Sequence, residues 1–365
     1  MTRVVAPPGE PAKAARLEGV QALRFLAALL VVIGHCQHEA VEALGAQAGA
    51  ARFLAFDWGL GVDIFFVISG FIMWHLMQDG FGKPGEAQRF LRRRVLRIVP
   101  IYWLGTTAIA LVTLAAFSPG ESIPFALASY LFIPWPHPDG RGLFPVLTLG
   151  WTLNYEMMFY CVFALALTLP RRLGLTLLLS VFAALFVAAR LAPPQAFMLK
   201  FWGDPIIFEF LFGIGLAALH RHRATLPGWV ALIVAGAGFL LATWSYQTGA
   251  YHELARAITG GIPALLIVGA VVCGPRLSVS SRPARLAVLG GDASYALYLA
   301  HPFALKAVAA VSAKLGLWTL APVAPILAML AAAVIVSVLI YRFVERPILS
   351  ALQRHFARPA VRLGS

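Results

Sequence analysis

Residues 19–35 of the chain read Gly19-Val-Gln-Ala-Leu-Arg-Phe-Leu-Ala-Ala-Leu-Leu-Val-Val-Ile-Gly-His35. The stretch is almost entirely apolar, and its two titratable side chains, Arg24 and His35, are eleven residues apart. Because an α-helix has about 3.6 residues per turn, we expect both on one helical face, roughly 16 Å apart along the axis. A histidine in an apolar helix is most often a hydrogen-bonded packing residue, unless other polar side chains gather at its depth.

The composition indicates that lipid surrounds much of the chain. It has 365 residues, of which 60% are hydrophobic and 12% charged, with a mean hydropathy of +0.80. A soluble domain carries about 25% charged residues. The net charge of +13 does not indicate a nucleic-acid partner, because the basic residues punctuate apolar runs as juxtamembrane anchors do. The three cysteines lie in apolar segments without metal-ligand spacing, which favours small core residues: Cys36, Cys161 and Cys273.

Ten stretches of the chain are long and apolar enough to cross a bilayer, which requires about 20 residues. They are 20–38, 58–77, 98–117, 150–169, 173–191, 203–219, 228–244, 258–273, 291–313 and 322–343. With both termini cytoplasmic, most of the 29 Lys and Arg residues fall on the inner side, as the positive-inside rule requires. The predicted fold is therefore all-α and integral to the membrane, with about ten transmembrane helices.

The sequence predicts one membrane domain between two short tails. We expect a cytoplasmic tail over 1–18, a transmembrane domain over 19–347 and a cytoplasmic tail over 348–365. The segment 123–134 is apolar but too short to span, so it is interpreted as a re-entrant or interfacial piece. Residues 1–18 show no cleavable signal pattern.

Four titratable residues from four predicted helices fall in the outer third of the membrane: His35, Asp63, Glu156 and Glu209. A charged side chain near the bilayer centre costs at least about 2.5 kcal/mol, so each needs a partner or a function. Any one carboxylate could simply form a structural pair. A histidine with a carboxylate neighbour is the arrangement of a general base, because the carboxylate fixes the tautomer and stabilises the imidazolium.

Arginines gather at the inner end of the first and third predicted helices. Arg24 is level with Arg93, Arg94 and Arg97, and the last two share a helical face. Ordinary anchoring is the favoured interpretation for Arg92 and Arg93, whereas clustered guanidinium groups suit phosphates. A ligand that reaches from these arginines to His35 is about 15–20 Å long. An acyl-coenzyme A fits that length and charge, as would other long anionic ligands.

Two further stretches hold polar residues at membrane depth. Ser69 and Gly70 lie near the predicted midplane, where small residues usually allow close helix packing. Ser294, Tyr298 and His301 share one helical face and could line an acyl tunnel or form a structural hydrogen-bond ladder. The sequence contains no metal motif and no phosphate-binding glycine loop.

Six ordered motifs resemble those of the membrane-bound acyltransferase-3 family, over about 19–347. They are Arg24 with His35, Gly61-Val-Asp-Ile-Phe-Phe-Val-Ile-Ser-Gly-Phe71, Arg94 and Arg97 before Pro100 and Tyr102, Trp151 to Tyr160 with Glu156, Ser294 to His301, and Phe343-Val-Glu-Arg-Pro347.

This resemblance implies a ten-helix membrane enzyme that uses cytoplasmic acyl-CoA, most often acetyl-CoA. By this resemblance, His35 is the catalytic histidine, and Arg24, Arg94 and Arg97 bind the acyl donor. Some members also have an extracytoplasmic SGNH-type hydrolase domain. This chain has none, so we expect its membrane domain to act on the acceptor directly. The variant Thr152-Leu-Asn-Tyr-Glu156 looks more like the exopolysaccharide-modifying branch.

The resulting hypothesis is an O-acyltransferase of a bacterial inner membrane. It acts on an exported or surface saccharide, or on a lipid-linked glycan. His35 is the general base, with Glu156 or Asp63 to orient it, or the nucleophile of an acyl-histidine intermediate. The predicted donor-binding residues are Arg24, Arg93, Arg94, Arg97, Ser69, Tyr298 and His301. A secondary transporter or glycan flippase is the alternative, although the chain shows no inverted repeat.

Overall fold

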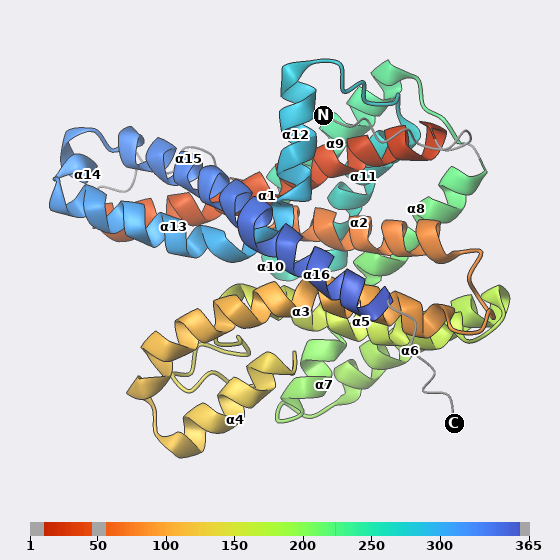
Figure 1. Ribbon diagram of the computed structural model, residues 1–365, viewed down its shortest axis with the longest axis horizontal. Helices are drawn as coiled ribbons and strands as arrows, with labels where there is room; N and C mark the ends of the chain where they lie inside the picture. The colour runs from red at the N-terminus through yellow and green to blue at the C-terminus, as the bar shows by residue number, and fades with distance from the viewer. Residues whose placement is uncertain (1–10, 46–55, 223, 358–365) are drawn as a thin grey trace. The chain divides into compact units, whose positions relative to one another are not determined.

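The structure is a computed structural model that describes residues 11–45, 56–222 and 224–357. Within those ranges every regular element is a helix (Figure 1). The α-helices are α1 (Pro11–Leu44), α2 (Leu60–Met77), α3 (Glu86–Thr113), α4 (Pro119–Tyr130), α5 (Trp151–Leu167), α6 (Arg171–Leu191), α7 (Phe197–Trp202), α8 (Phe208–Arg221), α9 (Gly228–Thr248), α10 (Ala250–Glu253), α11 (Ile262–Cys273), α12 (Arg282–Asp292), α13 (Ser294–Lys314), α14 (Leu317–Leu320), α15 (Val323–Ile340) and α16 (Arg346–Ala357).

Eight helical segments of the described chain are long and apolar enough to cross a membrane. They are Glu18–Leu44, Leu60–Met77, Glu86–Ala116, Arg171–Leu191, Phe197–Arg221, Gly228–Thr248, Ser294–Lys314 and Val323–Phe356. The two other predicted spans, 150–169 and 258–273, correspond to shorter helices. They are α5, with 17 residues, and the segment Ala257–Cys273, which begins with a π-helical turn. The all-α integral membrane fold predicted from the sequence is confirmed.

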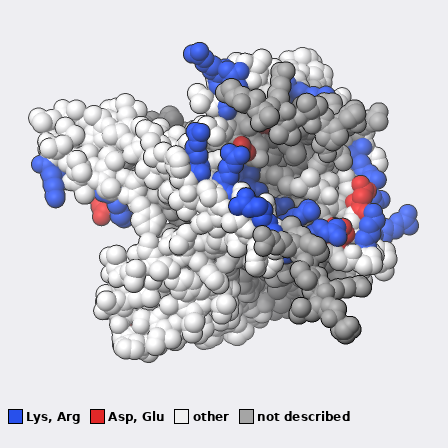
Figure 2. All heavy atoms as spheres, viewed as in Figure 1, with Lys and Arg blue, Asp and Glu red and all other residues white. Residues whose placement is uncertain are grey.

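The helices expose large apolar side chains that only lipid solvates well. Leu111, Leu191 and Leu232 are 79%, 81% and 75% exposed. The space-filling view agrees, because most of the face it shows carries neither Lys and Arg nor Asp and Glu (Figure 2). Since an exposed leucine in water forfeits the hydrophobic stabilisation of burial, these surfaces indicate a multi-pass membrane protein.

The chain divides into two compact units. The first contains residues 1–78 and 205–334, and with them α1, α2, α8 to α14 and most of α15. The second contains residues 79–204 and 335–365, with α3 to α7 and α16. Of the predicted site residues, the first unit holds Arg24, His35, Asp63, Ser69, Glu209, Tyr298 and His301, and the second holds Arg93, Arg94, Arg97 and Glu156.

In the first unit α2 and α8 pack with their backbones almost in contact. A Cβ atom on Gly70 would lie 2.0 Å from the carbonyl oxygen of Phe210, and one on Gly213 would lie 2.1 Å from that of Val67. Small residues at such crossings let transmembrane helices gain van der Waals contact, since lipid provides no hydrophobic drive between them. The packing role predicted for Gly70 thus has a direct structural basis.

In the second unit α4 folds back against α3. The Tyr102 hydroxyl donates to the Ser129 carbonyl (3.0 Å), and the Trp103 indole donates to the Tyr130 carbonyl (2.9 Å). The helix begins with a capping box between Ser118 and Glu121, which satisfies its first backbone donors. The predicted 123–134 segment is therefore mostly helical, and its re-entrant or interfacial position stays a prediction.

We expect Gly213→Ala to destabilise the protein, because the added methyl group meets the backbone of α2, which cannot move aside. Overpacking of this kind costs about 1–3 kcal/mol. The matched control is Gly215→Ala on the same helix, where a Cβ atom has nothing within 4 Å. Thermal unfolding in detergent, followed by circular dichroism, checks this prediction. Equal midpoints for the two variants would contradict it.

Candidate functional site

His35 and His301 lie in direct ring contact in the first unit. They come from α1 and α13, which run side by side (Figure 1). Their ring centroids are 4.9 Å apart with an interplanar angle of 62°. His35 is half-buried, whereas His301 is fully buried. The histidine predicted from the sequence therefore has a second imidazole, rather than a hydrocarbon side chain, as its neighbour.

Each histidine is held by a hydrogen bond to its own helix. Nδ1 of His35 is 2.8 Å from the Val31 carbonyl oxygen, and Nδ1 of His301 is 3.0 Å from that of Leu297. A carbonyl oxygen only accepts, so in the neutral rings Nδ1 carries the proton and Nε2 carries the lone pair. Nε2 of His35 is thus the nitrogen able to accept a proton from a substrate.

Two buried serines lie on α2 and α13 of the same unit. Ser69 on α2 and Ser294 on α13 are 6% and 0% exposed, and within the described residues neither hydroxyl has a hydrogen-bond partner. The rings of Phe65 and Tyr298 bring these two helices together, with centroids 6.2 Å apart. Both interpretations of Ser294, Tyr298 and His301 predict a polar strip inside the protein, and the choice between tunnel and structural ladder stays open.

Asp63 is fully buried and bound by an arginine that the sequence analysis missed. Arg256 donates from Nε to Oδ1 of Asp63 (2.8 Å) and from Nη2 to Oδ2 (3.4 Å). Gly260 makes room for this carboxylate, since a Cβ atom there would lie 2.6 Å from it. Glu209, also fully buried, is within electrostatic reach of Arg256. Both carboxylate oxygens of Asp63 therefore accept hydrogen bonds from Arg256. The predicted role of Asp63 in orienting His35 stays a prediction.

The arginines predicted to bind the donor differ in burial. Arg24 in the first unit is 9% exposed, and its Nη1 lies 3.2 Å from the Gln21 amide oxygen. In the second unit Arg93 is exposed, as an anchor would be, whereas Arg94 and Arg97 are half-buried.

Arg94 stands out among these arginines. Its guanidinium carbon is 5.8 Å from the centre of the Phe90 ring, and Tyr160 and Glu156 are within electrostatic reach. Its Nε is buried and has no hydrogen-bond partner in the described part of the chain. Glu156 is therefore placed with the arginine group of its own unit, which the sequence did not indicate. Its predicted pairing with His35 is untested.

Asn154 is a second residue that the sequence analysis missed. Its side chain is 0% exposed, and among the described residues neither its amide nitrogen nor its oxygen has a hydrogen-bond partner. A buried polar group left without partners costs about 1–3 kcal/mol, so such groups are rare in proteins. The available signal was an amide inside an otherwise apolar helix, two residues before Glu156.

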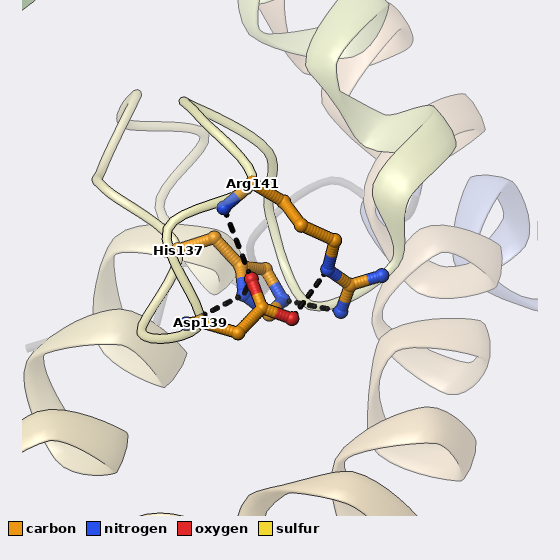
Figure 3. A network of polar contacts seen from close by, with 3 residues as sticks. All are labelled: His137, Asp139 and Arg141. Carbon is orange, nitrogen blue, oxygen red and sulfur yellow. Dashed lines mark hydrogen bonds and ion pairs between the residues drawn. The ribbon is translucent and has the colours of Figure 1, made fainter.

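A polar network closes the loop that follows α4 (Figure 3). Asp139 receives hydrogen bonds from the backbone and side chain of Arg141, and its Oδ1 lies 2.6 Å from His137 Nδ1. Nη2 of Arg141 is 3.2 Å from His137 Nε2, and the Phe125 ring packs on the imidazole with centroids 4.7 Å apart. Burial first, and then the neighbouring Arg141, lowers the pKa of His137. Charged and polar contacts therefore hold this loop together with the packing of the Phe125 ring.

The chain matches the profile of a family described as an acyltransferase domain over residues 17–342. It is 34% identical over 293 residues to the exopolysaccharide production protein ExoZ of Rhizobium meliloti (strain 1021), covering 79% of this chain and 89% of that protein. It is 27% identical over 380 residues to the acyltransferase MdmB of Streptomyces mycarofaciens, covering 94% of each. No solved structure matches the chain.

In the residues that the structure describes, no three His, Cys, Asp or Glu side chains gather as metal ligands would.

We expect Asp63→Asn to lower the free energy of unfolding by roughly 1–3 kcal/mol, because it removes a buried carboxylate that forms an ion pair with Arg256. The loss is smaller than for a fully buried pair, since the Arg256 side chain is 37% exposed. Chemical or thermal unfolding in detergent measures it. Arg89→Ala, which breaks the exposed pair with Glu86, is the control and costs less than about 1 kcal/mol. Equal losses for both variants would refute the structural importance of the Asp63 pair.

We expect the wild type to lose stability as the pH falls below about 6.5, through His137. Because the folded state lowers the pKa of His137, the unfolded chain binds its proton at a higher pH. Stability is therefore greatest above the unfolded value and declines toward the folded one. Comparing unfolding midpoints at pH 7.5 and pH 5.0 tests this. His137→Gln should show a smaller decline than wild type, and an identical decline in both proteins would speak against it.

Proposed function

Because the chain belongs to the acyltransferase-3 family, we propose that it is an integral membrane O-acyltransferase of the bacterial inner membrane. It transfers an acyl group, acetyl in the simplest case, from cytoplasmic acyl-CoA to a hydroxyl of an exported or surface saccharide. Two observations support a saccharide acceptor. The ExoZ relative is named for exopolysaccharide production, and this chain covers 89% of it. The motif around Glu156 also resembles that branch of the family.

The observation that carries the proposal is the tautomer of the His35 imidazole. Its Nδ1–H is committed to the Val31 carbonyl, so Nε2 carries the lone pair that a general base needs. The ring is half-buried, which leaves part of it accessible to a substrate. A base with this tautomer inside an apolar helix suits proton abstraction from a hydroxyl.

In the proposed reaction, His35 accepts one proton and later returns it. The acceptor hydroxyl gives its proton to His35 Nε2, and its oxygen forms a bond to the thioester carbonyl carbon. The carbon–sulfur bond then breaks, and the coenzyme A thiolate takes the proton back from Nε2. The products are the sugar ester and free coenzyme A, with His35 restored to its neutral form.

Arginine side chains bind the phosphates of the acyl donor in this proposal. Arg94 is the strongest candidate, because its buried Nε has no partner in the described chain and a phosphate oxygen would supply one. Arg97 is half-buried one helical turn away and can contact the same anion. Arg24 and Arg93 are further candidates for the donor's phosphates.

Binding and turnover of acetyl-CoA by detergent-purified protein, with a saccharide acceptor, test this function. We expect wild type to bind acetyl-CoA and release coenzyme A thiol. His35→Ala should bind acetyl-CoA within about twofold of wild type but lose at least about a hundredfold in turnover, as for removal of a general base. Arg94→Ala should bind more weakly by about tenfold or more, since it loses a charge-assisted contact.

Arg92→Ala is the matched control for Arg94→Ala, because Arg92 is exposed on the same helix and carries the same charge. It should bind and turn over the donor like wild type. If none of the proteins binds acetyl-CoA or releases thiol, another donor or a transport function replaces the proposal. If His35→Ala turns over normally, the assignment of the base is wrong.

A further inference from the structure

His301 contributes a buried hydrogen-bond acceptor that the proposed chemistry does not yet use. Its Nδ1 faces the Leu297 carbonyl, so its lone pair is on Nε2, at the edge of the ring directed away from its own helix backbone. This nitrogen is buried and has no hydrogen-bond partner in the described residues. Leaving an acceptor unsatisfied in this way costs about 1–3 kcal/mol, which calls for a compensating role.

Two polar rings lie near His301: His35, at a centroid distance of 4.9 Å, and Tyr298 on the same helix, at 6.4 Å. His301 is 0% exposed, so neither solvent nor a ligand at the protein surface reaches it in this state. His35 is the nearer of these two polar rings, and it comes from another helix. When His35 is protonated, its positive charge lies beside the neutral His301 ring, whose lone pair can stabilise that charge while His35 Nε2 stays directed at the substrate.

Glu39 is the carboxylate within electrostatic reach of His35, and it is paired with Lys306. One turn further along the same helices, Glu39 is 3.0 Å from Lys306, a pair that also joins α1 to α13. Asp63 is bound by Arg256. His38 is exposed on α1. In the part of the first unit that the structure describes, no carboxylate makes a hydrogen bond or ion pair with His35.

Resting on the function proposed above, we propose that His301 is a positioning residue for His35. Its neutral imidazole fixes the His35 ring by contact, and its Nε2 lone pair stabilises the imidazolium that His35 becomes. His301 does not touch the substrate, and it neither gains nor loses a proton over the whole reaction.

This arrangement has a chemical consequence. The proton from the acceptor hydroxyl is held on His35 Nε2, beside a neutral acceptor, until the thiolate removes it. A neutral partner stabilises the imidazolium less than a carboxylate would, so His35 returns the proton more readily. Two protonated rings at this distance would repel each other, so the pair holds at most one added proton.

Three substitutions of His301 separate this role from packing. His301→Phe keeps an aromatic ring against His35 but removes the acceptor. His301→Gln places an amide oxygen near the position of Nε2, whereas His301→Asn reaches only as far as Nδ1. We expect the phenylalanine and asparagine variants to lose at least about tenfold in kcat, because the imidazolium is no longer stabilised. KM for acetyl-CoA should stay within about twofold, and His301→Gln should recover most of the lost kcat.

Lys314→Ala is the matched control, since it removes an exposed charge from the same helix, thirteen residues from His301. It should keep wild-type kcat and KM. Thermal unfolding of each variant shows that it is folded. Wild-type kcat in His301→Phe would overturn the proposal. So would a glutamine variant as impaired as the phenylalanine variant, because that result indicates a packing role.

A readout that does not depend on the donor separates this proposal from the function itself. Diethyl pyrocarbonate modifies only unprotonated imidazole, and mass spectrometry reports its rate at His35, with exposed His38 as the internal reference. We expect the pH at which labelling of His35 falls to half its maximum to be lower in His301→Phe than in wild type, because the variant no longer stabilises the imidazolium. His301→Gln should match wild type.

If wild type does not turn over acetyl-CoA, the proposed function fails and the labelling experiment alone decides the role of His301. The same pH dependence of His35 labelling in wild type and His301→Phe would then reject it.

Discussion

The constraint that organises this protein is the absence of water in the hydrocarbon layer. Every backbone N–H and C=O group there must find a partner within the protein, and a helix is the local solution. Side chains obey the same rule. The hydroxyls of Thr107, Thr113 and Thr243 each donate to the carbonyl four residues earlier, so they bring no unsatisfied group into the membrane. Against that background the few polar groups that lack such partners are conspicuous.

The same local bond serves a chemical purpose in His35 and His301. Each imidazole donates from Nδ1 to the carbonyl four residues earlier, which satisfies one nitrogen and fixes the tautomer. In a soluble enzyme a carboxylate commonly does this work, at the cost of burying a charge. Here the helix backbone does it without added charge. This is economical where each isolated charge costs at least about 2.5 kcal/mol.

The sequence predicts the helices far better than it predicts their partners. Apolar length is a property of each segment alone, so the spans could be found without knowing the packing, including the shorter α5 and α11. Which faces meet is a different matter. Asp63 binds an arginine 193 residues away, and His35 meets a histidine on α13. In helices that are apolar on most sides, hydrophobic periodicity does not mark the contacting face, so these pairs could not be derived from it.

The candidate site follows the same division. Arg94 and His35 could be found in sequence because each interrupts an apolar run, and the motifs that contain them resemble a known family. Arg256 escaped notice because a basic residue between two spans is ordinary in a membrane protein, and only the fold shows that it reaches Asp63. Asn154 is uncharged, so it lowers the hydropathy of its helix only slightly, yet burying its amide unpaired costs as much as removing a hydrogen bond from a core. In lipid, therefore, the polar residues that sequence analysis discounts most easily, the uncharged ones and those at helix ends, are the ones whose partners most need to be established by structure.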